Sequence, residues 1–208
     1  GEGTGKSTQA RPLADHLRVA GHEVVVTREP GGTPLAEAIR DLILANRPQE
    51  PRAEFLLFAA ARAEHLTATI KPALERGAWV ICDRFIDSTR VYQGDIFKVD
   101  ADLIAAIEHL TVAPWFPDLT LILDLAPRVG LARAAERGAL SRFDSARMDT
   151  HAALRAGFLK IARAEPRRCA VVDAAGDVAT VAARVLEVVG ERLQLQPEAG
   201  LDKKGRPT

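Results

Sequence analysis

The sequence predicts an α/β fold, in which helices cover both faces of a central parallel sheet. Short apolar runs rich in Val, Ile and Leu recur without strict alternation, as in strands buried on both faces of a sheet. Helical patterns separate these runs, which is the order expected for strands joined by right-handed crossovers. The length of 208 residues suits a single domain.

Each expected element follows from one of these patterns. The apolar runs predict strands at residues 23–27, 78–83, 119–125 and 169–173. The helical periodicity predicts helices at residues 7–20, 35–45, 53–76, 101–111, 128–137, 149–164 and 178–193. We assign residues 1–195 to one domain, and we expect the polar segment 196–208, which contains Pro and Gly, to form a frayed tail.

The charge balance limits the possible ligands. The 28 Lys and Arg residues equal the 28 Asp and Glu residues in number, so the formal net charge is zero. A nucleic acid or an anionic membrane surface favours a basic partner, and we expect neither. An anionic ligand therefore requires a local cluster of cations. Of these cations 22 are Arg, the better residue for gripping anions, although overall composition also accounts for the excess.

The cysteines and the apolar runs indicate the compartment. Cys82 and Cys169 are too few for a disulfide framework and lack metal-ligand spacing, so we expect a reducing, cytoplasmic environment. No apolar run approaches about 18 residues, and the first residues show no basic region followed by an apolar one. The sequence therefore predicts neither a membrane span nor a signal peptide.

The first residues carry the most specific motif. Gly5, Lys6 and Ser7 fill the last three places of the phosphate-binding loop G-x-x-x-x-G-K-[ST], in which Lys reaches the terminal phosphates and the hydroxyl binds Mg²⁺. The helix that follows directs its positive end at the phosphates. The first Gly of the pattern would stand one residue before Gly1, and the sequence lacks the strand that should lead into the loop. A chance Gly-rich segment therefore competes with a true loop whose strand is missing.

Charged residues follow the first two expected strands. Arg28 precedes Glu-Pro-Gly-Gly-Thr, a turn at a strand end, and Asp83 and Arg84 follow the next strand. Doubly wound sheets bind ligands at these ends, and an Asp there can hold Mg²⁺. The competing interpretations are a charged neighbour of a turn for Arg28 and a surface salt bridge for the Asp-Arg pair.

Two helical patterns carry further candidates. Phe58 and Arg62 lie four residues apart on one helix face, so they either pack in the core or present a stacking ring and a donor to a planar base. Arg133 and Arg137 share another helix face, and Arg142 follows them. Without further context these three form a solvated basic stripe.

Taken together and in this order, the segments resemble bacterial thymidylate kinases, which phosphorylate dTMP with ATP. The matching segments are Glu-Gly-Thr-Gly-Lys-Ser-Thr from residue 2, Thr-Arg-Glu-Pro-Gly-Gly-Thr from 27, Phe-Ala-Ala-Ala-Arg from 58, Cys-Asp-Arg-Phe-Ile-Asp-Ser-Thr from 82, Tyr-Gln-Gly from 92 and Pro-Asp-Leu-Thr-Leu from 117. The resemblance extends from residue 1 to about residue 193. It implies the three-layer P-loop nucleoside-monophosphate kinase sandwich, with a helical lid at about residues 133–147 and a five-stranded sheet whose first, central strand is absent from this sequence.

The resemblance also implies the binding residues. Those for ATP are Gly1, Glu2, Gly3, Thr4, Gly5, Lys6, Ser7, Thr8 and Arg133, with Mg²⁺ at Ser7 and Asp83. Those for dTMP are Glu2, Arg28, Arg40, Phe58, Arg62, Arg84, Thr89, Tyr92 and Gln93. In the family pattern the arginines at 28, 40 and 84 surround the acceptor phosphate. The ring at 58 stacks on thymine, the guanidinium at 62 contacts its O4, and the tyrosine crowds the 2′ position against ribose. The carboxylate at 2 accepts from the sugar 3′-OH.

For catalysis the resemblance implies Lys6, Asp83 and Arg84, together with arginines delivered by the lid. The loop has Thr4 where some relatives carry an arginine, so the lid supplies that charge, with Arg142 the first choice and Arg137 the second. Arg90 receives no role. A homodimer packed through helices is implied as well. Two other functions stay open at this point, a kinase for another nucleotide or nucleoside, and a non-catalytic nucleotide-binding remnant if the chain begins at Gly1.

Overall fold

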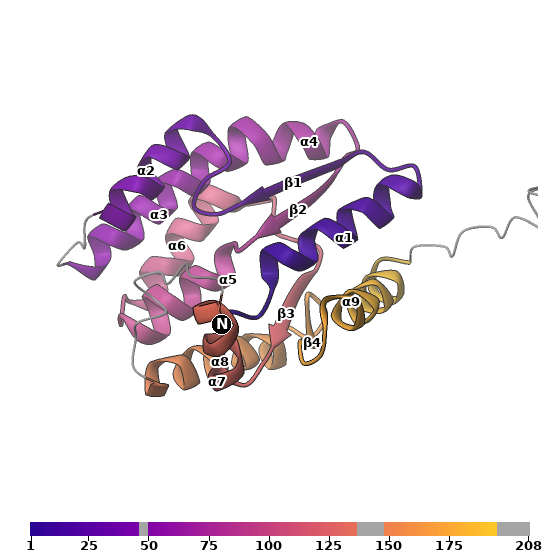
Figure 1. Ribbon diagram of the computed structural model, residues 1–208. Helices are drawn as coiled ribbons and strands as arrows, with labels where there is room; N and C mark the ends of the chain where they lie inside the picture. The colour runs from indigo at the N-terminus through magenta and orange to yellow at the C-terminus, as the bar shows by residue number, and fades with distance from the viewer. Residues whose placement is uncertain (46–49, 137–147, 195–208) are drawn as a thin grey trace, which may run out of the picture.

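The structure is a computed structural model that describes residues 1–45, 50–136 and 148–194. Helices and strands alternate along the chain, as the sequence predicts (Figure 1). The elements are, in order, α1 (Lys6–Val19), β1 (Val24–Arg28), α2 (Pro34–Ala45), α3 (Pro51–His65), η1 (Leu66–Ile70), α4 (Lys71–Glu75), β2 (Trp79–Asp83), α5 (Ile86–Thr89), η2 (Arg90–Ile96), α6 (Ala101–Val112), β3 (Thr120–Asp124), α7 (Pro127–Glu136), α8 (Met148–Ala164), β4 (Cys169–Asp173) and α9 (Val178–Leu193).

Two regions differ from the expected elements. The single helix expected at residues 53–76 is divided into α3 and α4 by the π-helical segment η1. A helical segment that the sequence analysis did not predict, α5 followed by the π-helical η2, comes directly after β2. Segments of π-helix are rare and occur often at functional sites. The predicted tail at 196–208 and most of the predicted lid at 133–147 lie outside the described residues.

The strands form two parallel pairs. Strand β1 pairs with β2, with Val24 opposite Trp79, and β3 pairs with β4, with Thr120 opposite Cys169. In the described residues β2 and β3 are not hydrogen-bonded to each other. The prediction of a parallel α/β arrangement is confirmed, but these four strands form two half-sheets rather than one continuous sheet.

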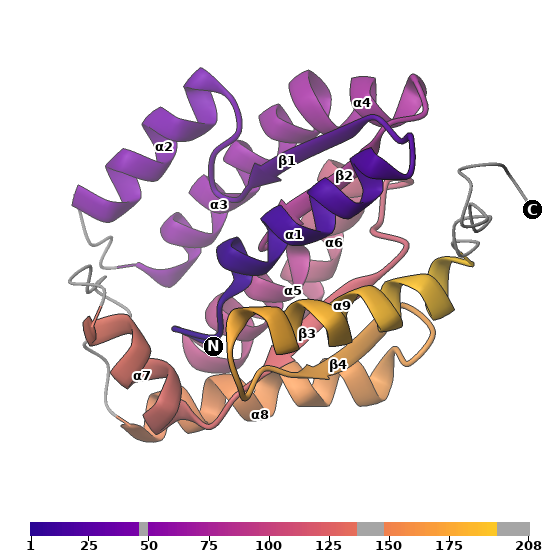
Figure 2. The same ribbon diagram turned by 45° about the vertical axis from the view of Figure 1, so that its right-hand side comes forward.

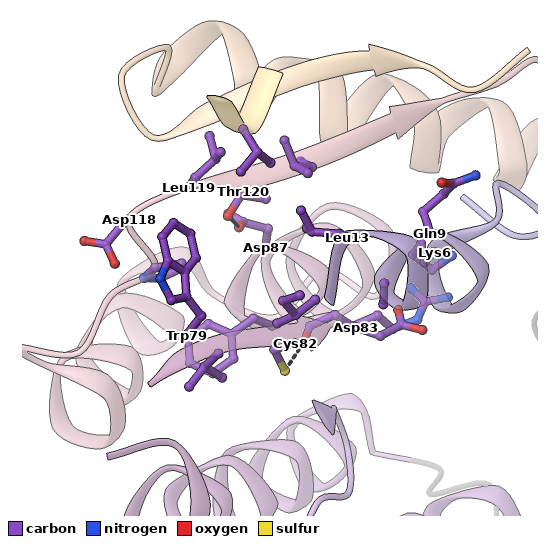
Figure 3. Close-up of a pocket in the computed structure, with 18 of the residues that line it drawn as sticks. Lys6, Gln9, Leu13, Trp79, Cys82, Asp83, Asp87, Asp118, Leu119 and Thr120 are labelled. Carbon is purple, nitrogen blue, oxygen red and sulfur yellow. Dashed lines mark hydrogen bonds between the residues drawn. The ribbon is translucent and has the colours of Figure 1, made fainter. Parts of the chain in front are cut away.

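A cavity of about 640 Å³ separates the half-sheets. Trp79 and Cys82 of β2 line it on one side and Leu119 and Thr120 on the other, and Leu13 of α1 projects into it (Figure 3). The cavity lies between β2 and β3, each of which is paired with a parallel strand, β1 or β4, on its other side. It therefore occupies the place where the family resemblance implies a further, central strand.

Helices cover both faces of the second half-sheet. Neighbouring residues of a strand point to opposite faces, so Leu123 and Ile122 of β3 face different layers. Leu123 belongs to a core with Leu17 of α1 and Val185 of α9, whereas Ile122 packs with Ala162 of α8. Figures 1 and 2 accordingly show α9 and α8 on opposite sides of β3 and β4, with α1 beside α9. This three-layer arrangement brings the carboxyl ends of β1 and β2 next to the N-terminus of α1.

Candidate active site

The N-terminal loop has the backbone that a phosphate-binding loop requires. Gly3 and Gly5 adopt φ angles of 66° and 89°, in the left-handed region where glycine is favoured. Gly5 is also the N-terminal cap of α1, whose first residue is Lys6. The Lys6 ammonium donates to the carbonyl oxygen of Gly1 at 2.6 Å, so the side chain folds back over the loop. The positive N-terminal end of α1 thus borders the space enclosed by the loop.

The phosphate loop rests directly on the first turns of α7. A Cβ atom added to Gly3 would collide with the backbone of Gly130, and one added to Gly130 would collide with the carbonyl oxygen of Glu2. Two glycines therefore permit a backbone-to-backbone contact that any side chain would block. Because α7 leads into the segment predicted as the lid, this contact joins the loop to the base of that segment.

Two oxygen-bearing side chains meet at the start of α1. The Ser7 hydroxyl donates to Oδ2 of Asp83, and the other carboxylate oxygen, Oδ1, is buried without a hydrogen-bond partner in the described residues. An unpartnered buried carboxylate oxygen beside a hydroxyl is a donor set that suits a hard cation such as Mg²⁺. Among the described residues no group of three or more His, Cys, Asp or Glu side chains forms a metal cage. Mg²⁺ is typically held by one or two protein ligands together with phosphates and water, so the residues present fit it.

Arg84 does not pair with its neighbour Asp83 but joins β2 to the phosphate loop. Its Nη2 donates to Oε1 of Glu2 at 2.6 Å, and the Tyr92 hydroxyl donates to the same oxygen at 2.6 Å. The guanidinium also lies 5.3 Å from the centroid of the Tyr92 ring. Burial alone would raise the pKa of Glu2, but Arg84, Lys6 and Tyr92 outweigh it and lower that pKa to about 2. The carboxylate is therefore ionised and holds both partners in place.

Two further arginines line the same pocket. Arg28 pairs with Glu37 at 3.0 Å in a partly exposed position, and Nη1 of Arg40 donates to the carbonyl oxygen of Pro30 at 3.0 Å. Burial and the nearby charge of Arg28 lower the pKa of Arg40. This repulsion between like charges marks a site that an anion would stabilise.

The other end of the pocket is less polar. Phe58 is partly exposed, lines the pocket and belongs to none of the core clusters of the described residues, which favours the stacking interpretation over the core one. Arg62 is 3% exposed, and it donates through Nε to Glu29 at 2.7 Å and through Nη2 to Thr89 at 2.9 Å. The Gln93 amide donates to Glu54 at 3.2 Å. These contacts fix the polar groups around the ring.

One pocket of about 290 Å³ collects nearly the whole predicted site. It is lined by every residue predicted to bind dTMP, namely Glu2, Arg28, Arg40, Phe58, Arg62, Arg84, Thr89, Tyr92 and Gln93. The loop residues Gly3, Gly5, Lys6 and Ser7 and the carboxylate of Asp83 line it as well. The pocket therefore joins the phosphate loop to the carboxyl ends of β1 and β2.

Several predicted ATP residues lie elsewhere. Arg133 does not line this pocket, and its two Nη groups donate to the carbonyl oxygens of Ala174 at 3.1 Å and Gly176 at 2.8 Å, after β4. Thr4 donates to the carbonyl oxygen of Gly1, and Thr8 is exposed on α1. The two lid arginines predicted to be catalytic, Arg137 and Arg142, lie outside the described residues, so their roles stay predictions.

Several residues of the pocket and its surroundings were not predicted from the sequence. Glu29, Phe85 and Ser88 line the pocket, and the fully buried His65 lies behind Glu29. A signal for Glu29 existed, since an acidic residue at a buried strand end needs a cationic partner. Nothing in the local sequence around His65 indicated that partnership.

Fold and site together define a class. A loop rich in glycine at a helix N-terminus, a hydroxyl and a carboxylate suited to Mg²⁺, and an arginine-lined pocket at the ends of parallel strands are the features of a P-loop nucleotide kinase. The family model of thymidylate kinase matches residues 1–185. The chain belongs to the thymidylate kinase family and is a kinase, a phosphotransferase.

Curated relatives and a solved structure agree with this assignment. The chain is 53% identical over 197 residues to the thymidylate kinase of Caulobacter vibrioides, covering 94% of this chain and 95% of that protein. It is 49% identical to that of Bradyrhizobium diazoefficiens over 202 residues, covering 95% and 89%. The crystal structure of the thymidylate kinase from Ehrlichia chaffeensis matches with a TM-score of 0.76 and 34% identity, covering 91% of this chain and 94% of that one. Of the interpretations left open by the sequence, these findings support thymidylate kinase.

No helix in the described part of the chain combines the length and apolarity that crossing a membrane requires.

Proposed function

We propose that the 290 Å³ pocket is the dTMP site of an ATP-dependent thymidylate kinase, with the donor phosphates held by the adjoining loop. The observation that carries this proposal is the convergence of the loop and all predicted dTMP residues on one cavity. The acceptor phosphate lies toward Arg28, Arg40 and Arg84, and the base lies toward Phe58 and Arg62. In this orientation the phosphate of dTMP lies at the cationic end of the pocket, and its thymine ring lies at the aromatic end.

Catalysis in this arrangement rests on positioning and charge. The loop N–H groups and Lys6 hold the donor phosphates, while Arg84 holds the acceptor phosphate in line with them. The charges that develop on the transferring group are stabilised by cations fixed before the reaction, which requires no covalent enzyme intermediate. Arg133, Arg137 and Arg142 are assigned to the donor side and the lid, with Arg142 first and Arg137 second as the catalytic cation.

Ser7 and Asp83 are the proposed ligands of Mg²⁺. The buried Oδ1 atom of Asp83, which has no partner in the described residues, supports this assignment. When bound, Mg²⁺ neutralises part of the phosphate charge. The chain contributes the hydroxyl and the carboxylate, held together by their own hydrogen bond.

The contacts around Tyr92 support a preference for deoxyribose. Its hydroxyl is held by Glu2 at 2.6 Å and its ring by Arg84, so the ring cannot move aside easily to admit a 2′-OH. At the base, Arg62 offers N–H groups, which match a carbonyl oxygen and repel the amino group that cytosine carries at the same place.

We also propose a cytoplasmic homodimer. Leu35 and Leu42 of α2 and Leu56 of α3 are about half exposed, at 54%, 50% and 49%. Helices α2 and α3 pack against each other and together present these side chains, which supports an interface built from helices. The cysteines are free thiols, in keeping with a reducing compartment.

The experiment that tests this function is a coupled assay of ADP release with ATP, Mg²⁺ and a series of acceptors. We expect turnover with dTMP to exceed that with dCMP, dGMP and AMP, and the Arg62→Leu variant to lose preference for dTMP over dCMP. A rate with dTMP equal to the rate without acceptor refutes the proposed pocket. An unchanged preference in Arg62→Leu refutes the proposed base contact alone.

A further inference from the structure

The histidine at the end of α3 is completely buried behind the nucleotide pocket. His65 is 0% exposed, and both of its ring nitrogens have partners. Nδ1 lies 3.2 Å from Oε1 of Glu29, and Nε2 lies 2.7 Å from the hydroxyl of Thr27. Burying the polar atoms of an imidazole is unfavourable unless each is hydrogen-bonded, and here both ring nitrogens are satisfied.

The partners determine the direction of these hydrogen bonds. The carboxylate of Glu29 pairs with Arg62 and acts as an acceptor, so Nδ1 of His65 carries the proton and donates to it. Nε2 then accepts from the hydroxyl of Thr27 in the neutral ring. The chain of contacts therefore runs from Thr27 through the imidazole to Glu29.

Glu29 connects His65 to Arg62, which lines the pocket. Its second oxygen, Oε2, accepts from Nε of Arg62 at 2.7 Å, and Thr89 accepts from Nη2 at 2.9 Å. These bonds use two of the five N–H groups of a guanidinium, and Nη1 has no hydrogen-bond partner among the described residues. The guanidinium also lies 5.3 Å from the centroid of the Phe85 ring. Arg62 is thus held on two edges while it lines the nucleotide pocket.

The turn after β1 closes around the imidazole. Gly32 has a φ angle of 86°, and a Cβ atom there would collide with the side chains of His65 and Thr27. The carbonyl oxygen of Gly32 accepts from the Thr69 hydroxyl at 3.0 Å, which fixes the turn against η1. The imidazole is therefore enclosed by β1, the Gly-rich turn and α3, and it has little freedom to rotate.

We propose that His65 is a positioning residue for base recognition: by fixing the carboxylate of Glu29, it aims the guanidinium of Arg62 at a carbonyl-bearing pyrimidine in the acceptor nucleotide. This inference rests on the proposed base contact of Arg62 and deepens it. An arginine side chain has many rotamers, and binding through a preordered one avoids the entropy of fixing it when the nucleotide arrives. The loss of that order lowers discrimination at the base and leaves the phosphate contacts in place.

Two amide variants separate the two hydrogen bonds of the ring. His65→Asn places an amide N–H near the position of Nδ1 and keeps the bond to Glu29. His65→Gln reaches the position of Nε2, keeps the bond to Thr27 and loses the one to Glu29. The quantity to measure is the ratio of kcat/KM for dTMP to that for dCMP. The matched control is the ratio for dTMP to dUMP, because dUMP carries the same 4-carbonyl group.

We expect His65→Gln to lower the dTMP to dCMP ratio by about tenfold, the scale of one charged hydrogen bond, and His65→Asn, which loses only the neutral bond to Thr27, to lower it by about threefold. Neither variant should change the dTMP to dUMP ratio or the KM for ATP. In the Arg62→Leu background the His65→Gln change should have no further effect on the ratio, since the residue acts through Arg62. A purely structural role would instead change both ratios together.

The outcomes separate the inference from the proposed function. If Arg62→Leu leaves the dTMP to dCMP ratio unchanged, the base contact itself is wrong. If Arg62→Leu lowers the ratio and His65→Gln does not, only the positioning role is overturned. Should both His65 variants fail to fold, Thr27→Val takes the place of His65→Asn, because it removes the same bond to Nε2 with little change of volume. We expect it to lower the ratio about threefold, and an unchanged ratio overturns the proposal.

Discussion

Replacing Arg84 with methionine removes the guanidinium that joins β2 to the phosphate loop while keeping a long, unbranched side chain. The variant loses the 2.6 Å ion pair with Glu2 and the cation over the Tyr92 ring. It also loses the proposed contact with the acceptor phosphate. Because the two side chains of the pair are only 23% and 13% exposed, solvent screens their interaction weakly.

The expected magnitudes follow from these contacts. A charge-assisted hydrogen bond contributes about 1.5–3 kcal/mol, so kcat/KM for dTMP should fall by about 10- to 150-fold. Glu2 keeps the hydrogen bond from Tyr92 and the attraction of Lys6, so its carboxylate is not left alone. The free energy of unfolding should therefore fall by only about 1–2 kcal/mol, less than for a fully buried pair that is broken.

The measurements are steady-state kinetics with dTMP varied at saturating ATP, and urea unfolding of both proteins. Arg18→Met is the matched control, because Arg18 pairs with Asp15 in an exposed position, with side chains 48% and 73% exposed. Such pairs contribute about 0–1 kcal/mol, so the control should have wild-type kinetics. If Arg84→Met retains kcat/KM for dTMP within about twofold of wild type, the reasoning about the phosphate contact is refuted.

Three further predictions concern stability and the phosphate loop. Glu2→Gln should lower the free energy of unfolding by about 3 kcal/mol above pH 4.5, because the pKa of Glu2 is lowered from 4.5 to about 2 in the folded protein. Only the ionised carboxylate stabilises the fold, so urea titrations should show the difference disappearing as the pH falls to about 2. A difference that does not depend on pH contradicts this prediction. Arg168→Met should lower the urea-derived stability by about 2–3 kcal/mol, since it removes the bidentate partner of Asp87, which is 5% exposed and keeps only Thr120 at 3.1 Å and Arg90 at 3.7 Å; a loss below about 1 kcal/mol rules this out. Gly130→Ala should lower kcat/KM for ATP at least about tenfold, because the added Cβ displaces the phosphate loop at Glu2. The control Gly190→Ala, where an added Cβ meets nothing, should leave kcat/KM for ATP unchanged. Equal kinetics in the two variants would disprove the role of the contact between α7 and the phosphate loop.

The strands and long helices could be predicted because their signals are local. β4 coincides with the expected 169–173, and the other strands agree within a residue or two at each end. A strand covered on both faces requires an uninterrupted apolar run, and the chain has few such runs. The phosphate loop was equally local, because its glycines and the lysine follow one another in sequence.

The segment after β2 could not be predicted as helix. α5 is only four residues long, and η2 is π-helical, so neither shows the 3.6-residue periodicity on which the prediction depends. The family motif nonetheless placed Thr89, Tyr92 and Gln93 in the pocket, where the structure has them. The family motif and the helical periodicity are independent signals, and only the family motif covers the residues of α5 and η2.

Partnerships between distant residues were the least predictable feature. Arg62 and Glu29 are 33 positions apart, and His65 and Glu29 are 36 apart. The sequence shows which side chains are charged, but which of them meet depends on the packing of α3 against the turn after β1. A buried charge requires a partner without specifying which one, and this is why His65 was overlooked.

Two arginines of the described residues, Arg168 and Arg40, differ in how completely their N–H groups are used. Arg168 donates four hydrogen bonds, from Nε and both Nη atoms to Asp87, Glu165 and Thr120, so most of its five N–H groups are used within the fold. Among the described residues Arg40 makes a single hydrogen bond, to the backbone carbonyl of Pro30, and it lines the pocket. An anion can bind only where donors are left for it. A chain with zero net charge can therefore still present donors to an anion, because Arg28, Arg62 and Arg84 keep further N–H groups beyond those that pair with Glu37, Glu29 and Glu2.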